Sequence, residues 1–162
     1  MKTIVYRGGV VTFRIPAHWR EEYSDMDGGT FYENQSDSGT LRLKILTFSV
    51  PKKLRTFTAS DLLQVPANDL KKLGVEGSTR DRADGNAVFK YEESGFERGE
   101  ELIVFYWVIA NPLPPRHARV ATFSYTILAE QRAQEHVRRD LEMLEAEIEA
   151  ATFYPGLGVV AE

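Results

Sequence analysis

The sequence has no cysteine, and this absence excludes disulfide bonds, thiolate nucleophiles and cysteine-ligated metal sites. Its three histidines, His18, His117 and His136, are far apart and have no spacing that would bring two of them to one metal ion. The glycine-rich turns of nucleotide-binding proteins and the serine elbow of hydrolases are also missing. We therefore expect no metal, no cofactor and no catalytic residue, in a protein that is not an enzyme.

No charge of one sign dominates. Asp and Glu number 24 against 20 for Lys and Arg, which gives a formal net charge of -4. Nucleic acids and anionic membranes favour a basic face, so we expect neither as a partner. No stretch approaches the roughly 18 apolar residues of a membrane span. Residues 1–9 have too short an apolar run and too early a glycine turn for a signal peptide, so we expect the protein in the cytoplasm.

The length of 162 residues and the hydrophobic content of 43% suit one domain over residues 1–162, with residues 153–162 as a C-terminal tail. The most informative segment is 101–110, ELIVFYWVIA, which is apolar at both alternating sets of positions. This pattern predicts a central strand that is covered on both faces. Phe105 and Trp107 should therefore lie in the core.

The N-terminal third predicts two β-hairpins. Strands over 3–6 and 10–15 flank a glycine pair, and strands over 30–33 and 41–45 flank a polar, turn-rich segment. A helix should follow, with Thr58 as its N-cap and Gly74 at its end. Because a proline in a helix removes one hydrogen bond and clashes with the preceding turn, we expect this helix to start late, kink or split at Pro66.

The C-terminal half predicts three strands and a long helix. Strands over 86–92 and 100–110 surround a turn at Ser94-Gly95, and a third strand covers 119–128. The helix, from about 130 to 151, carries an apolar stripe of Val137, Leu141, Leu144 and Ile148. The order of elements predicts an α+β fold with a mostly antiparallel sheet. Since the central strand needs cover on both faces, the two helices should lie on opposite sides.

The segment 11–19, VTFRIPAHW, is a strand that leads into a proline and then a tryptophan. It resembles the opening of proteins with the PsbP-like fold, a group that also contains the Mog-type Ran-binding factors and the DcrB-like bacterial proteins. The end of the chain, YTIL at 125–128 leading into a long helix, is similar to that group as well. The resemblance covers most of the chain as a pattern, and no functional residue is carried over from it. It implies an α/β/α sandwich, with a mostly antiparallel sheet flanked by helices, that serves as a binding or assembly module.

Two segments are candidates for binding a partner. The loop 111–117 contains three prolines, and a segment that is already stiff loses little entropy on association. The tail either packs back on the sheet or presents apolar side chains, including Leu157, Val159 and Val160, to a neighbour, with a homodimer as the simplest case. The candidate residues are Asn111, Pro112, Leu113, Pro114, Pro115, Phe153 and Tyr154.

The leading hypothesis is a non-catalytic, cytoplasmic bacterial module that binds another protein, as an accessory factor, an effector chaperone or an immunity-like protein does. The alternative is an enzyme or small-ligand-binding protein whose site is assembled from separated residues near Trp19, and its candidate residues are His18, Trp19, Tyr32 and Arg42. Trp19 has a second interpretation, because an aromatic residue just past a strand end is commonly part of the core.

Overall fold

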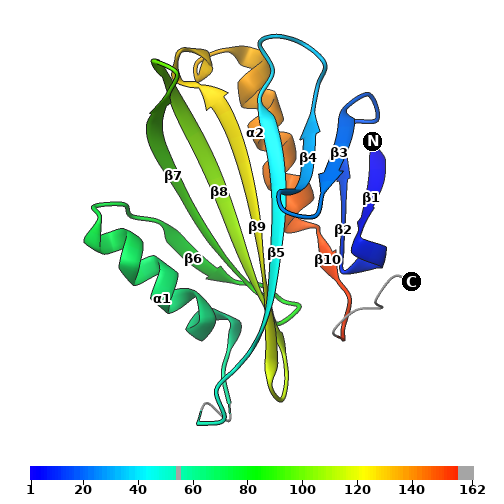
Figure 1. Cartoon of the computed structure of the whole chain (residues 1–162), viewed down its shortest axis with the longest axis vertical. Coiled ribbons are helices and arrows are strands. Elements are labelled where there is room, and N and C mark those ends of the chain that lie inside the picture. Colours follow the sequence, from blue (N-terminus) through cyan, green and yellow to red (C-terminus); the bar gives the residue numbers. More distant parts are fainter. Residues whose placement is uncertain (54–55, 157–162) are drawn as a thin grey trace.

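Two antiparallel sheets and two helices make up the fold of residues 1–53 and 56–156, which the computed structural model describes (Figure 1). The large sheet has seven strands in the order β3-β4-β5-β9-β8-β7-β6, and the small sheet has three in the order β1-β2-β10. Short 3-10 turns cover Arg7–Gly9 and Ala129–Gln131. The bounds are β1 Lys2–Tyr6, β2 Val11–Ile15, β3 Arg20–Ser24, β4 Gly28–Tyr32, β5 Thr40–Ser49, α1 Ala59–Lys72, β6 Ser78–Asp81, β7 Ala87–Glu97, β8 Glu100–Leu113, β9 His117–Leu128, α2 Glu135–Glu149 and β10 Thr152–Phe153.

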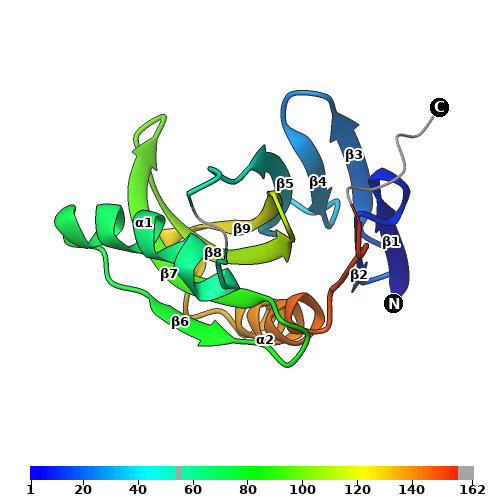
Figure 2. The same ribbon diagram turned by 90° about the horizontal axis from the view of Figure 1, so that it is seen from below.

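The two helices cover opposite faces of the large sheet (Figures 1 and 2). α1 packs against β6, β7 and β8, and α2 covers the other face together with the small sheet. The predicted α+β sandwich, with a mostly antiparallel sheet between helices, is confirmed. Both predicted hairpins are confirmed as well, as β1 with β2 and β4 with β5.

β8 is the central strand that the pattern ELIVFYWVIA predicts, with β7 on one side and β9 on the other. Trp107 and Ile109 are buried on the α2 side, and Val108 and Ala110 are buried against α1. Phe105 is half-buried and packs against the α2-side core. Both faces of the C-terminal half of β8 are buried. Its N-terminal half is only partly buried, because the strands there continue past α1 (Figure 1).

An aromatic cluster joins the two sheets. Phe13 of β2 meets Phe31 of β4 and Phe123 of β9 edge to face, at ring-centroid distances of 5.4 and 5.2 Å. All three side chains are buried. Edge-to-face pairs contribute about 0.5–1.5 kcal/mol beyond the burial of their surface. The small sheet is therefore packed firmly on the large one.

α1 begins where the sequence predicts. The Thr58 side chain accepts a hydrogen bond from the Asp61 backbone N at 3.2 Å, and Asp61 Oδ2 accepts one from the Thr58 backbone N at 2.9 Å. Gly74, at φ 80°, follows the last turn as predicted. The expected late start or split at Pro66 is wrong, because α1 runs without a break over Ala59–Lys72. Apolar side chains of α1 pack on the sheet on both sides of Pro66, so the helix tolerates the one lost backbone hydrogen bond.

The turn between β7 and β8 lies at Arg98-Gly99, so the prediction of a turn at Ser94-Gly95 is wrong. Arg98 and Gly99 have φ values of 52° and 80°, and the residues on either side pair with each other. A two-residue loop with positive φ at both positions matches the twist of the strands that it joins. Gly95 pairs with Leu102 inside the ladder, and β7 is correspondingly longer than predicted.

Three short strands, β3, β6 and β10, have no counterpart in the prediction. β3 and β6 are exposed along their whole length, so no buried face marks them in the sequence. The predicted helix from about 130 divides into a 3-10 turn and α2, which starts at Glu135. Val137, Leu144 and Ile148 of its apolar stripe are buried, and Leu141 packs against the same core.

Among the described residues, none of the helices has the length and apolar character needed to cross a membrane.

Candidate protein-interaction site

The two segments that the sequence singled out for partner binding lie together at one end of the molecule. They surround a hollow of about 540 Å³ with the turn between β6 and β7. Its walls come from residues 84–86, 111–114 and 152–155. Three parts of the chain that are far apart in sequence therefore form one surface feature.

The proline-containing segment is mostly strand. Asn111, Pro112 and Leu113 extend β8 and pair with Arg119, Ala118 and His117 of β9, so only residues 114–116 form the turn. Past Ala110, none of the described residues pairs with β8 on its β7 side, and a strand edge of this kind tolerates proline. The Pro114-Pro115 peptide bond is cis. The exposed part of the predicted loop is a short turn over residues 114–116.

A buried polar network lies beneath this hollow. Arg119 has 0% of its surface exposed, and its Nε and Nη2 atoms donate to Asn111 Oδ1 at 3.0 and 2.9 Å. Asn111 Nδ2 donates to Asn86 Oδ1 at 2.7 Å, and Arg119 Nη2 also donates to the Tyr154 carbonyl. No carboxylate in the described residues pairs with Arg119, and burial lowers the pKa of its guanidinium. The network joins the hairpin, the β6–β7 turn and the segment after α2, and the oxygen atoms that accept from Arg119 in it are neutral.

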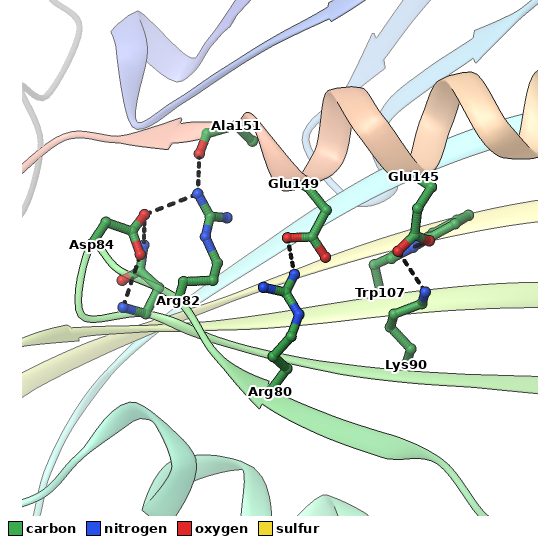
Figure 3. A network of polar contacts seen from close by, with 9 residues as sticks. Arg80, Arg82, Asp84, Lys90, Trp107, Glu145, Glu149 and Ala151 are labelled. Atoms are coloured by element: carbon green, nitrogen blue, oxygen red, sulfur yellow. Dashed lines mark hydrogen bonds and ion pairs between the residues drawn. The ribbon is translucent and has the colours of Figure 1, made fainter.

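A second arginine fixes the β6–β7 turn to the end of α2 (Figure 3). Arg82 Nη2 donates to the Ala151 carbonyl at 2.8 Å and forms an ion pair with Asp84 at 2.9 Å. Asp84 in turn accepts hydrogen bonds from the backbone N and the side-chain Nδ2 of Asn86, at 3.1 and 3.0 Å. Because hydrogen bonds to charged groups stabilise a fold by about 1.5–3 kcal/mol each, these contacts hold the walls of the hollow in place.

The start of the predicted tail packs on its own chain. Phe153 pairs with Val11 as part of β10 and packs half-buried against the core. The Tyr154 backbone N donates to the Val10 carbonyl at 3.1 Å, while its side chain is 42% exposed at the hollow. The other apolar tail residues, Leu157, Val159 and Val160, lie outside the described residues.

Of the four residues of the alternative ligand site, Tyr32 and Arg42 share one face of the neighbouring strands β4 and β5, and Trp19 lies apart from them in the core. Trp19 is buried in the core and stacks on Tyr125 at a ring-centroid distance of 6.5 Å. His18 is exposed, with Nε2 at 3.1 Å from a carboxylate oxygen of Glu33. Tyr32 and Arg42 alternate with the buried residues Phe31, Leu41 and Leu43, so they project from the opposite face of the large sheet.

A second hollow, of about 480 Å³, lies where β7 passes beyond β6. The sequence gives no indication of this hollow, because the apolar pattern of β7 ends near residue 92 and no buried face marks β6. Its lining includes Tyr91, Phe105, Tyr106 and Leu141. The Arg98-Gly99 pair, which fits a two-residue hairpin loop, is the sequence signal that would have placed the end of β7 correctly.

Comparison with known proteins identifies the fold. No family model matches the sequence, and no curated protein matches it. Among solved structures, LpqN of Mycobacterium tuberculosis, described as involved in cell envelope biogenesis, is similar with a TM-score of 0.64 at 16% identity, over 90% of this chain and 83% of LpqN. The Ran-binding protein Mog1p of Saccharomyces cerevisiae has a TM-score of 0.55 at 12% identity, over 94% of each chain.

A protein from Bacteroides thetaiotaomicron is similar with a TM-score of 0.59 at 16% identity, and this chain spans 48% of that protein's length. The chain therefore has the fold of the Mog-type and PsbP-like group, as the resemblance of segment 11–19 implied.

Proposed function

We propose that this chain is a non-catalytic protein-binding module and that its partner docks at the hollow between the β8–β9 turn and the segment after α2. The observation that carries the proposal is the convergence of residues 111–114 and 152–155 on one hollow. The buried arginine and asparagine side chains beneath it fix both segments before any partner arrives. A surface that is already ordered loses little conformational entropy on binding.

The named neighbours support a binding role without specifying it for this chain. Mog1p is described as Ran-binding and LpqN as involved in cell envelope biogenesis. For this chain we propose a role in the cytoplasm as an accessory factor, an effector chaperone or an immunity-like protein. Fractionation of cells that produce the chain, followed by immunoblotting, tests the compartment.

Site-specific photocrosslinking tests the binding site. A benzophenone amino acid replaces Pro114 or Tyr154, both of which line the hollow, and in a control it replaces Ala133. Ala133 is exposed and lies just after β9, at the opposite end of that strand from the hairpin turn. We expect the same adduct from positions 114 and 154 in cells of the source organism, and none from position 133.

The mass of the adduct distinguishes a different protein from a second copy of this chain. An adduct of twice the chain mass, with a dimer in light scattering, would assign the hollow to a homodimer. No adduct from either wall position, or equal adducts from all three positions, would overturn the proposed site.

A further inference from the structure

We propose that the outer edge of β7, residues 91–97, takes up an extended segment of another protein as an additional strand of the large sheet, and that this segment carries basic side chains. This surface is separate from the hollow beside the β8–β9 turn. The inference begins with an unpaired strand. β6 pairs with β7 only from Asp81↔Ala87 to Ser78↔Lys90, whereas β7 continues to Glu97. In the described part of the chain, β8 alone pairs with residues 91–97, and Figure 1 shows β7 as the outer strand there.

The backbone groups of this edge point outward in a regular ladder. The backbone N of Arg82 donates to the Asn86 carbonyl at 2.8 Å, so the polar backbone groups of Asn86 face the β6 side. Backbone groups in an antiparallel ladder change side at every residue. The N–H and C=O groups that face outward beyond β6 are therefore those of Glu92, Ser94 and Phe96. An added strand would hydrogen-bond to these groups.

The side chains next to the edge provide a place for an apolar residue. On the α2 side, the 480 Å³ hollow is lined by Phe105 and Leu141, and by the Trp107 ring, whose Nε1 donates to Glu145 Oε2 at 2.8 Å (Figure 3). An apolar side chain opposite Glu92 would project to this side of the sheet, because residues that pair directly share a face. The added strand therefore has one apolar face.

The other face of the edge is acidic. Glu93 and Glu97 lie on the same side of the sheet as Tyr91, which stacks on Tyr106 at a ring-centroid distance of 4.5 Å. Neither of these glutamates has an ion-pair partner among the described residues. Basic side chains opposite both positions would neutralise them and rest against the tyrosine pair. Like charges directly opposite destabilise a strand pair, so the same acidic edge disfavours pairing with a second copy of itself.

A peptide with this pattern is the probe. A capped peptide of about nine residues, in which Lys and Val alternate, places Lys on one face of an extended strand and Val on the other. In nitrogen-15 NMR spectra of the full chain, we expect saturable shifts centred on the amides of Glu92, Ser94 and Phe96 at peptide concentrations up to about 1 mM. The same peptide with Glu in place of Lys should not bind. A Lys peptide N-methylated at alternate amides should lose binding, because it cannot form the ladder.

Variants of the protein provide the matched test. Ser94→Pro removes an outward N–H and should weaken binding of the Lys peptide about tenfold or more, whereas Ser94→Thr retains the N–H and should bind normally. Glu93→Lys with Glu97→Lys should abolish binding of the Lys peptide and permit binding of the Glu peptide. The comparison of methylated with unmethylated peptide uses the unaltered protein, so it decides the question even where Ser94→Pro fails to fold.

Three results would overturn the inference: no shift at about 1 mM peptide, shifts centred away from β7, or binding that backbone methylation leaves unchanged. A dimer of the free protein that Ser94→Pro dissociates would also overturn it, by assigning the edge to a second copy. None of these results bears on crosslinking at Pro114 and Tyr154. The peptide experiments therefore test the β7 edge alone, and the crosslinking experiment tests the docking hollow alone.

Discussion

Replacing Trp107 with alanine tests whether β8 is buried on its α2 side. The Trp107 side chain is 3% exposed and belongs to the core that α2 covers. Truncation of a buried aromatic side chain costs about 3–5 kcal/mol of unfolding free energy, because transfer energy is lost and a cavity remains. Trp107→Phe retains most of the ring but removes the hydrogen bond to Glu145, whose carboxylate still pairs with Lys90. We expect this second change to cost about 1–2 kcal/mol.

Urea unfolding, followed by far-UV circular dichroism and by fluorescence, measures both losses. Trp19 remains as the fluorescent reporter because the chain has only two tryptophans. Phe96→Ala is the matched control, since Phe96 lies on β7 with 79% of its surface exposed, and we expect a change within about 0.5 kcal/mol. A loss below about 1 kcal/mol for Trp107→Ala would refute the buried position of β8.

Three further predictions concern a helix cap, a turn and a buried acid. Thr58→Ala removes the side-chain acceptor of the α1 cap and should lower the unfolding free energy by about 0.5–2 kcal/mol, which urea titration measures, whereas Thr58→Ser should not. Gly99→Ala should lower the thermal midpoint, because Gly99 has φ 80°, which alanine adopts only with strain. Gly95→Ala should not lower it, because Gly95 lies in a strand with open space around it. A larger loss of thermal midpoint for Gly95→Ala than for Gly99→Ala would place the turn at Gly95. Burial raises the pKa of Asp140 in the folded protein above its value in the unfolded chain. Between these two pKa values, folding is accompanied by uptake of a proton, so the unfolding free energy falls as pH rises through this range. Urea titrations between about pH 4 and 7 should therefore show Asp140→Asn gaining stability relative to the unaltered protein as pH rises, and a constant difference would contradict the raised pKa.

The parts of the fold that follow from local pattern were predictable. The continuous apolar run around Trp107 identified the central strand, and Thr58 and Gly74 marked the ends of α1. β3 and β6 could not be found in this way, because every residue in them is exposed and their place depends on neighbouring strands. The predicted break at Pro66 was wrong, because the packing of α1 on the sheet outweighs the local free-energy cost of the proline.

The binding residues were partly accessible to sequence reasoning. The prolines of the β8–β9 hairpin and the apolar residues after α2 were selected separately, and the sequence held no sign that they adjoin. The contact that joins them runs through Arg119, which the sequence presents as one charged residue in a strand. Its burial depends on Asn111, Asn86 and the Tyr154 carbonyl, and only the tertiary fold brings those groups together.

The pairing of β10 with β2 has a consequence for synthesis on the ribosome. β2 can pair with β10 only after α2 has been synthesised. In the same way, β5 can pair with β9 only after the segment between them and β9 itself have been synthesised. Until then, the apolar faces of the N-terminal hairpins lack the cover that β9 and α2 provide in the folded core, and such surfaces are prone to aggregate. Pairings between segments so distant in sequence also slow folding, since a long loop must close before they form. Nascent chains of this protein should therefore depend on general chaperones until release, and chains that stop before α2 should accumulate as aggregates instead of half-folded domains.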